Sequence, residues 1–316
     1  MLNYIARRIL IAIPVFLGIT IIAFFLIYMA PGNPVDMLIN PHVTQAALDA
    51  KSEALGLNQP IYVQYFKWFS NMLHGNLGYS MKTYRPVTEM IGERIGPTLL
   101  LMGLSLLVGF IIAIPIGILS ATKQYSKLDY AAITGSFLGI SVPNFFLGLG
   151  LVYIFSVKLR WLPSSGMINI GQGGGFTDRL LHLILPVTVL AANVAGRDVR
   201  YIRSSMLEIL GQDYLRTARA KGLREFFVIN KHALRNALIP IVTILGLEIP
   251  IMFAGAVVTE KIFSWPGIGQ LTIDSILSRD YPTVMGLNIL AAVIVLAANL
   301  ITDIIYAFVD PRIKYN

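Results

Sequence analysis

The placement of charged residues constrains this chain more than any other feature. Six long apolar segments carry almost no charge: Ile9–Ala30, Ile95–Thr122, Ala131–Val157, Leu180–Gly196, Asn236–Thr259 and Tyr281–Val309. Only Glu248 and Asp303 interrupt them. About 20 consecutive apolar residues cross the hydrocarbon core of a bilayer as a helix. The pattern therefore predicts an all-α integral membrane protein with six transmembrane helices in one domain, residues 1–316. The fourth segment is short, and we expect its helix to continue past Arg197.

Composition agrees with this class and excludes others. Of the 316 residues, 13% are charged and 55% are hydrophobic, whereas about 25% of a soluble domain is charged. The chain has no cysteine, and its four histidines lie far apart with no paired ligand spacing, so we expect no metal site and no disulfide. The net charge of +8 fits cytoplasmic loops of a membrane protein, so we expect a lipid bilayer and no nucleic acid as partner.

The distribution of basic residues predicts the orientation. With the N-terminus inside, the cytoplasmic segments hold 15 Lys and Arg against six Asp and Glu, and the outer segments hold ten against nine. Short cytoplasmic loops carry the excess of Lys and Arg, so we expect both termini in the cytoplasm. The first apolar run has 22 residues and no small-x-small cleavage site before Pro31. It is longer than a signal-peptide core of about 7–15 residues, and we expect a retained anchor.

A long polar loop, residues 31–94, is predicted outside the membrane. One helix is expected from Thr44 to Gly56 and a second from Gln59-Pro60 to Gly75. The second carries five aromatic residues, a density typical of the membrane interface: Tyr62, Tyr65, Phe66, Trp68 and Phe69. The loop is interpreted either as a cap over the helix bundle or as a docking surface for an extracellular protein.

A basic stretch, residues 204–236, joins the fourth and fifth predicted spans. Gly222 is expected to break two short helices, because glycine has no Cβ penalty in left-handed conformations. At about 100° per residue, four apolar residues fall within about 60° of one another: Leu223, Phe227, Leu234 and Leu238. Arg224, Lys231 and Arg235 flank them. We expect this stripe to rest on the bundle and the basic flank to face the cytoplasm. The alternative is an ordinary positive loop that touches anionic lipid.

This stretch resembles the cytoplasmic "EAA" loop of ATP-binding-cassette (ABC) importer permeases, in which a helix–Gly–helix element fits a groove of the ATPase subunit. Arg216, Thr217, Ala218 and Gly222 occupy the family's Glu-Ala-Ala and Gly places, and the hydrophobic-Pro pair comes late, at Ile239-Pro240. These departures resemble the dipeptide and oligopeptide branch, which includes nickel importers. The resemblance assigns ATPase coupling to Tyr214, Arg216, Thr217, Ala218, Arg219, Ala220, Lys221, Gly222, His232, Arg235 and Asn236.

Further landmarks extend the resemblance over nearly the whole chain. They are Arg7-Arg8, Ala30-Pro31-Gly32-Asn33-Pro34, Gly75-Asn-Leu-Gly78-Tyr-Ser80, Arg203-Ser-Ser-Met206, Glu260-Lys-Ile-Phe-Ser-Trp-Pro-Gly267 and Asp310-Pro311-Arg312. The branch often has Asp where Asn33 stands. In this order the landmarks resemble the first permease of a heterodimeric pair, with the type I fold and cytoplasmic coupling helices.

The resemblance implies a subunit without catalysis of its own. The glycine run Gly171-Gln-Gly-Gly-Gly175 has no following Lys and is not a phosphate-binding loop. ATP and Mg²⁺ are expected at two partner ATPase subunits, and this chain is expected to bind no cofactor. A second homologous permease and an extracytoplasmic peptide-binding protein complete the expected complex in the cell membrane. Closure of the ATPases would move the coupling helices and open the pathway outward.

Acidic residues within or beside the spans are candidates for the translocation pathway, since a charge at bilayer depth costs roughly 3 kcal/mol and tends to face a bundle interior. Glu248 is interpreted either as a lining or gating residue or as a hydrogen-bonding partner of a neighbouring helix. Glu260 with Trp265-Pro266-Gly267 is interpreted as a turn at the pathway exit, or as an interfacial tryptophan anchor.

Three functions are compatible with these patterns. The first is a permease subunit of an ATP-driven importer of di- and oligopeptides. The second is the same architecture importing nickel or another small solute. The third is a stand-alone channel or secondary transporter, which needs charges along a pathway or inverted repeats with broken helices. The peptide importer is favoured, because the methionines are dispersed and His182 is the only histidine in a span.

Overall fold

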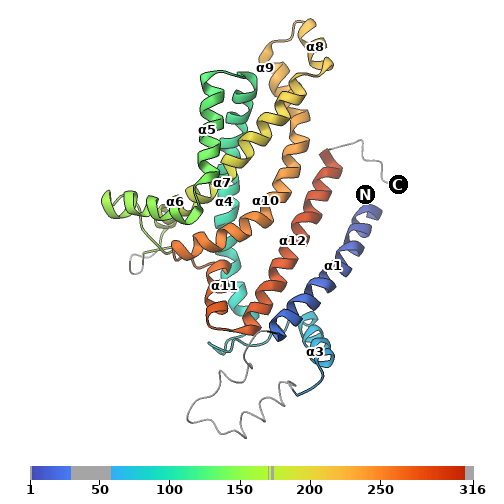
Figure 1. The fold of residues 1–316 in the computed structure, drawn as a ribbon, viewed down its shortest axis with the longest axis vertical. Coiled ribbons are helices and arrows are strands. Elements are labelled where there is room, and N and C mark those ends of the chain that lie inside the picture. Colours follow the sequence, from blue (N-terminus) through green and yellow to red (C-terminus); the bar gives the residue numbers. More distant parts are fainter. Residues whose placement is uncertain (1, 30–57, 170, 172–173, 310–316) are drawn as a thin grey trace. The chain divides into compact units, whose positions relative to one another are not determined.

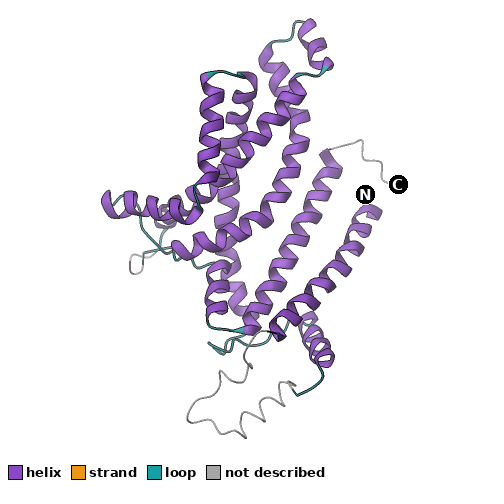
Figure 2. Ribbon diagram, viewed as in Figure 1, coloured by secondary structure: helices purple, strands orange, loops and turns teal. Residues whose placement is uncertain are grey.

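The regular structure of the chain is helical. The computed structural model describes residues 2–29, 58–169, 171 and 174–309, so the expected helix from Thr44 to Gly56 lies outside the described residues. Figure 2 shows helices joined by loops throughout the described part. Its α-helices are α1 (Leu2–Tyr28), α3 (Ile61–Leu73), α4 (Val87–Thr122), α5 (Lys127–Ser141), α6 (Asn144–Leu151), α7 (Phe176–Leu210), α8 (Asp213–Ala220), α9 (Glu225–Phe227), α10 (Leu234–Ile262), α11 (Ile268–Leu277) and α12 (Tyr281–Val309), and its π-helical segments are η2 (Val152–Lys158) and η3 (Val228–Ala233). The prediction of an all-α protein is confirmed.

The long helices coincide with the predicted spans. Among the described residues, four helices are long and apolar enough to cross a membrane, within α1, α4, α7 and α12. The pair of α5 and the helix that follows it passes the same test as one broken span. Helix α10 covers the predicted fifth span, Asn236–Thr259. Helix α7 runs on to Leu210, as expected from the pattern beyond Arg197.

The third predicted span is not one continuous helix. Its two halves meet at an angle of 97°, at the break between Ser141 and Asn144. Val142 adopts an extended conformation, with φ −83° and ψ 118°, as residues that precede proline prefer. Pro143 has no N–H to continue the α5 hydrogen bonds, and it caps α6 instead. The segment then ends in the π-helical turns of η2.

The described residues form two compact units, which are treated separately. In the first, residues 2–5, 97–169, 171, 174–270 and 297–309, α7 forms the centre and packs against α5, α6 and α10. Small residues allow the close approach of α5 and α7. A Cβ on Gly196 would lie 2.8 Å from the carbonyl oxygen of Ser136, so the two backbones touch directly.

The second unit, residues 6–29, 58–96 and 271–296, carries the outer loop. Helix α3 begins after Pro60 and ends before Gly75, which has a φ of +80°, so the predicted second loop helix is confirmed. Asp280 ties this loop to the start of α12. Its carboxylate accepts hydrogen bonds from the Ser80 hydroxyl at 2.5 Å, the Met81 amide at 3.0 Å and the Thr283 hydroxyl at 2.8 Å.

Candidate functional site

The basic stretch between the fourth and fifth spans forms a compact turn at the end of two long helices. Figure 1 shows α8 and α9 at the upper end of α7 and α10. Helix α7 ends at Leu210, α8 begins at Asp213, and α9, η3 and α10 lead back into the bundle. We call residues 213–236 the helical turn.

Gly222 reverses the chain between α8 and α9. Its φ of +77° is left-handed. The Gly222 amide donates to the Arg219 carbonyl oxygen at 2.9 Å, and the Leu223 amide donates to the Ala218 carbonyl oxygen at 3.4 Å. These two bonds constitute a Schellman motif, which satisfies the free carbonyl groups at a helix C-terminus. The predicted break at Gly222 is confirmed, and the reversal is a defined conformation.

An ion pair on the exposed side of the helical turn joins α8 to α9. The Arg219 guanidinium donates from Nε to Glu225 Oε2 at 3.1 Å and from Nη2 to Oε1 at 2.8 Å. This two-point geometry favours a fixed orientation of both side chains. Through the hydrogen bond, Arg219 lowers the pKa of the Glu225 carboxyl, and the carboxylate raises the pKa of Arg219. The partner Glu225 was missed by sequence reasoning, because it is six residues away, across a turn.

Buried side chains anchor the helical turn to the core of its unit. Leu215 and Ala218 of α8 and Val228 and Ala233 of η3 are buried in one cluster with Met206 of α7. Burial of a leucine side chain stabilises by about 1.5–3 kcal/mol. The helical turn is therefore fixed to the helix bundle on one side, so that a movement of the turn is transmitted to the bundle.

The predicted apolar stripe is wrong. Leu223 and Phe227 are 43% and 50% exposed, Leu234 is half-buried, and the Leu238 side chain lies outside the described residues. The second helix begins only at Glu225, and from Val228 it is π-helical. A π-helix bonds residue i to i+5, so the angle of 100° per residue does not apply. Leu223, Phe226 and Phe227 instead form an exposed apolar tip.

The remaining predicted coupling residues divide into bonded and exposed groups. The Asn236 amide donates to the Tyr214 hydroxyl at 2.7 Å and so joins α10 to α8. The Thr217 hydroxyl donates to the Asp213 carbonyl oxygen at 3.2 Å. Arg216 is exposed and contacts Asp213 at 3.5 Å. Ala220 and Lys221 are exposed, His232 is half-buried, and the Arg235 side chain lies outside the described residues.

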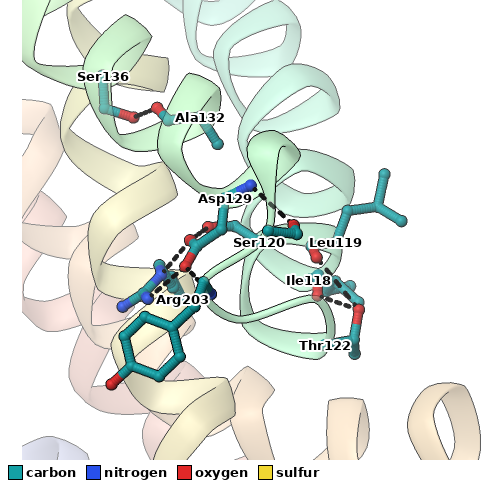
Figure 3. A network of polar contacts seen from close by, with 10 residues as sticks. Ile118, Leu119, Ser120, Thr122, Asp129, Ala132, Ser136 and Arg203 are labelled. Atoms are coloured by element: carbon teal, nitrogen blue, oxygen red, sulfur yellow. Dashed lines mark hydrogen bonds and ion pairs between the residues drawn. The ribbon is translucent and has the colours of Figure 1, made fainter.

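A buried carboxylate holds the helix that leads into the turn. Asp129, in the first turn of α5, accepts hydrogen bonds from Arg203 Nε at 2.7 Å and Nη2 at 2.8 Å. It also accepts from the Ser120 hydroxyl at 2.5 Å and the Tyr125 amide at 2.9 Å. Figure 3 shows Arg203 and Ser120 converging on this carboxylate. The network joins the end of α4, the start of α5 and the C-terminal part of α7.

From the sequence, Asp129 counts among the cytoplasmic acidic residues and Arg203 belongs to a landmark of the family resemblance, and neither observation predicted that they pair. Their separation of 74 residues leaves no periodic signal. The available hint was an acidic residue two positions before an apolar span, where an unpaired buried charge would be costly.

Glu248 pairs with the neighbouring helix. Its Oε1 accepts a hydrogen bond from Arg197 Nη1 at 2.8 Å, and Arg197 also donates to Asn193 Oδ1 at 2.7 Å. Glu248 is buried, and so is Asp198, whose carboxylate oxygens have no hydrogen-bond partner among the described residues. This geometry corresponds to the interpretation of Glu248 as a hydrogen-bonding partner of another span.

Glu260 organises the turn that follows α10. Its buried carboxylate accepts from the Thr98 hydroxyl at 2.6 Å and from the Gly269 and Gln270 amides at 2.7 and 3.2 Å. The two amides lie in the first turn of α11, where backbone N–H groups lack helical partners. Glu260 therefore caps α11 from another helix.

Trp265 is fully buried, and its indole Nε1 donates to the Pro97 carbonyl oxygen at 3.0 Å. The interpretation of Trp265 as an interfacial anchor is therefore wrong. Pro266 and Gly267 complete the turn, and a Cβ on Gly267 would collide with the Glu260 carboxylate. The glycine is required by this close approach.

Comparison with known proteins places the chain in a transport family. Residues 113–315 match the model of the binding-protein-dependent transport system inner membrane component, and residues 1–102 match the N-terminal model of the same systems' membrane component. The chain is 49% identical to the oligopeptide transport system permease protein AppB of Bacillus subtilis (strain 168), over 100% of both chains. It is 39% identical to the dipeptide transport system permease protein DppB of Escherichia coli (strain K12), over 100% of this chain and 99% of that protein.

Solved structures show a related fold. The inward-facing MetNI methionine ABC transporter matches with a TM-score of 0.58 at 18% identity, over 70% of this chain and 96% of that chain. An amino acid ABC transporter matches with a TM-score of 0.53 at 16% identity. The fold is thus that of an ABC transporter permease. The chain belongs to the family of inner membrane components of binding-protein-dependent transport systems.

Proposed function

We propose that this chain is a membrane-spanning permease subunit of an ATP-driven importer of di- and oligopeptides. The support for peptide cargo is the full-length similarity to permeases named for oligopeptide and dipeptide transport. A second, homologous permease completes the translocation pathway, and an extracytoplasmic binding protein delivers the peptide. The complex lies in the cell membrane, with both termini of this chain in the cytoplasm, in agreement with the excess of Lys and Arg there.

The helical turn is the docking element for an ATPase subunit. This assignment rests on the way in which the turn is built. The Schellman motif at Gly222 and the Arg219–Glu225 pair give it a fixed shape, and buried Leu215 holds it to the bundle. Its outer side presents the apolar tip of Leu223, Phe226 and Phe227. An apolar tip beside basic side chains fits a groove with an apolar floor and an acidic rim.

Movement of the turn is transmitted through α7. An ATPase that pulls on the helical turn also pulls on Leu215, which packs against α7 through Met206. The Arg203–Asp129 pair then carries the displacement from α7 to the hairpin of α4 and α5. Packed helices change between discrete arrangements rather than deforming continuously, so this linkage lets nucleotide state select between inward-open and outward-open pathways.

The residues predicted for the translocation pathway act through helix packing and do not line the pathway. Glu248 links α10 to α7, and Glu260, Trp265, Pro266 and Gly267 fix the turn between α10 and α11. In this role they set the positions of the helices that surround the cargo. They need not touch the peptide, because a translocation pathway that admits peptides with many different side chains should be lined by few fixed charges.

Transport by the reconstituted complex tests the proposal. The genes for this chain, its homologous permease, two ATPases and the binding protein are co-expressed, and the complex is placed in proteoliposomes. We expect ATP-dependent uptake of a labelled oligopeptide, no ATP hydrolysis by this chain alone, and loss of uptake when this chain is omitted. Uptake of nickel without uptake of peptide would overturn the peptide assignment and leave the permease assignment intact. Transport by this chain alone would favour the stand-alone transporter.

A further inference from the structure

Helix α3 of the outer loop packs along the side of the first spanning helix. Tyr65 and Phe24 are buried against each other with their ring centroids 5.5 Å apart, and the Phe24 ring lies 5.6 Å from Trp68. The Tyr65 hydroxyl lies 3.0 Å from the Thr20 hydroxyl. Met285 of α12 joins the same cluster. Figure 1 shows α3 beside the lower end of α1.

The contacts fix how deep α3 lies along the span. An α-helix rises about 1.5 Å per residue. Phe24 precedes the last residue of α1, Tyr28, by one turn, and Thr20 precedes it by two, which are distances of about 6 and about 12 Å along the axis. Met285 lies one turn, about 6 Å, inside the start of α12. Helix α3 is therefore level with the apolar ends of both spans and does not lie beyond them.

Three exposed apolar residues form a stripe on α3 beside its buried face. At about 100° per residue, Tyr62, Phe66 and Leu73 fall within about 40° of one another. They are 62%, 65% and 66% exposed. The far side of the helix carries Lys67 and Asn71, which are also exposed. The helix thus has a face on protein, an apolar face that no other described residue covers, and a polar face.

We propose that the stripe of Tyr62, Phe66 and Leu73 is inserted in lipid, so that α3 is an interfacial helix within the leaflet at the C-terminal end of α1. Interfacial helices bury an apolar face about 5–10 Å into the boundary of headgroups and acyl chains, which agrees with the depth given by Phe24 and Met285. Lys67 then lies toward the lipid headgroups. The orientation of the chain makes this the outer leaflet.

Lipid is favoured over a water-soluble partner by continuity with the surface of α1. Ile22 and Leu26, at the same depth, are 61% and 64% exposed on a helix that spans the membrane, and so they face lipid. A soluble binding protein approaches from beyond the ends of the spans and would have to displace lipid to reach the stripe. Tyr62 is also of a residue type that is enriched at membrane interfaces.

Site-directed spin labelling tests this placement. The chain has no cysteine, so an introduced cysteine is its single labelling site. Tyr62→Cys and Phe66→Cys carry the label on the stripe. Lys67→Cys and Asn71→Cys are matched controls on the polar face of the same helix, and Leu26→Cys on α1 is the reference for lipid exposure. Each variant is assembled into the full transport complex in vesicles of phosphatidylethanolamine and phosphatidylglycerol, with and without the binding protein.

The readout is the collision rate of each label with oxygen, which concentrates in lipid, and with a nickel chelate, which stays in water. We expect labels at Tyr62 and Phe66 to favour oxygen as strongly as the label at Leu26, and those at Lys67 and Asn71 to favour the chelate. Chelate access at Phe66 equal to that at Asn71 would overturn the proposal, since the stripe would then face water. Shielding of Phe66 from both reagents would also overturn it, because a protein would then cover the stripe. Either failure would leave the transport function untouched.

Discussion

Arg203 donates two hydrogen bonds to Asp129, from Nε to Oδ1 at 2.7 Å and from Nη2 to Oδ2 at 2.8 Å, and thereby joins α7 to the first turn of α5. Removing one partner of a buried ion pair leaves an uncompensated charge and costs about 3–5 kcal/mol. We expect Arg203→Ala to lower the thermal unfolding temperature of the complex clearly. Arg216→Ala, which removes an exposed contact to Asp213, is the control and should change stability little. Equal unfolding temperatures of the two variants would refute a stabilising role of the Arg203–Asp129 pair.

Gly222→Val should uncouple transport from ATP hydrolysis. The φ of +77° suits glycine and is strongly unfavourable for a β-branched residue, at a cost of roughly 1–2 kcal/mol or more. No atom lies within 4 Å of an added Cβ, so the effect comes from the backbone alone. Gly222→Asn is the matched control, because asparagine tolerates left-handed conformations. Peptide uptake per ATP hydrolysed should fall for Gly222→Val and remain for Gly222→Asn. Full uptake with Gly222→Val would disprove the coupling assignment.

The Arg219–Glu225 pair predicts a pH dependence of the helical turn. Arg219 lowers the Glu225 pKa from its ordinary value of 4.5, so the pair stabilises the turn fully above that value and is lost as pH falls through the lowered pKa. Hydrogen exchange of the Gly222 and Leu223 amides, corrected for intrinsic rates, should be constant between neutral pH and about pH 5 and faster below pH 4.5. Glu225→Gln should exchange faster at neutral pH. Equal protection in this variant and the wild type would contradict a role for the pair.

Glu248→Gln should reduce peptide uptake partially and leave the choice of solute unchanged. Glutamine keeps an acceptor for Arg197 but removes the charge of the pair. Glu248→Ala removes both, leaves the half-buried Arg197 without this partner, and should destabilise by up to about 3 kcal/mol. Uptake of a toxic peptide and of nickel is measured in cells that carry each variant, with expression as the control. A gain of nickel uptake in Glu248→Gln would contradict a packing role.

Gly267→Ala should destabilise the turn between α10 and α11. The added Cβ would collide with the Glu260 carboxylate, which is held by Thr98 and by the Gly269 and Gln270 amides. Overpacking of this kind costs typically 1–3 kcal/mol. Gly103→Ala in α4 is the control, since nothing lies within 4 Å of its Cβ and alanine favours helix. A lower unfolding temperature is expected for Gly267→Ala only, and a tolerated Gly267→Ala would mean that this turn readily repacks.

The helices and the reversal at Gly222 follow from the sequence alone. Apolar runs become helices in a membrane because lipid offers no hydrogen bonds to the backbone, and the glycine marks a left-handed residue whatever surrounds it. The break at Pro143 was not predicted, because Ala131–Val157 was expected to be one span, and the structure bends it by 97°. The helices and the reversal at Gly222 depend on each residue and its near neighbours, which is why periodicity and local chemistry predicted them.

Which residues contact one another across the chain depends on how the helices pack. Asp129 finds Arg203, and Glu260 finds Thr98 across 162 residues, through helix packing that depends on shape along whole faces. The side chains exposed at the helical turn also escaped prediction, because the chain is helical only from Glu225 and because η3 then changes the angle between successive residues. The sequence left Trp265 open between a packed turn and an interfacial anchor, and the structure buries it. An aromatic residue beside a span is equally suited to lipid and to a packed turn, and only the neighbouring helices make the choice.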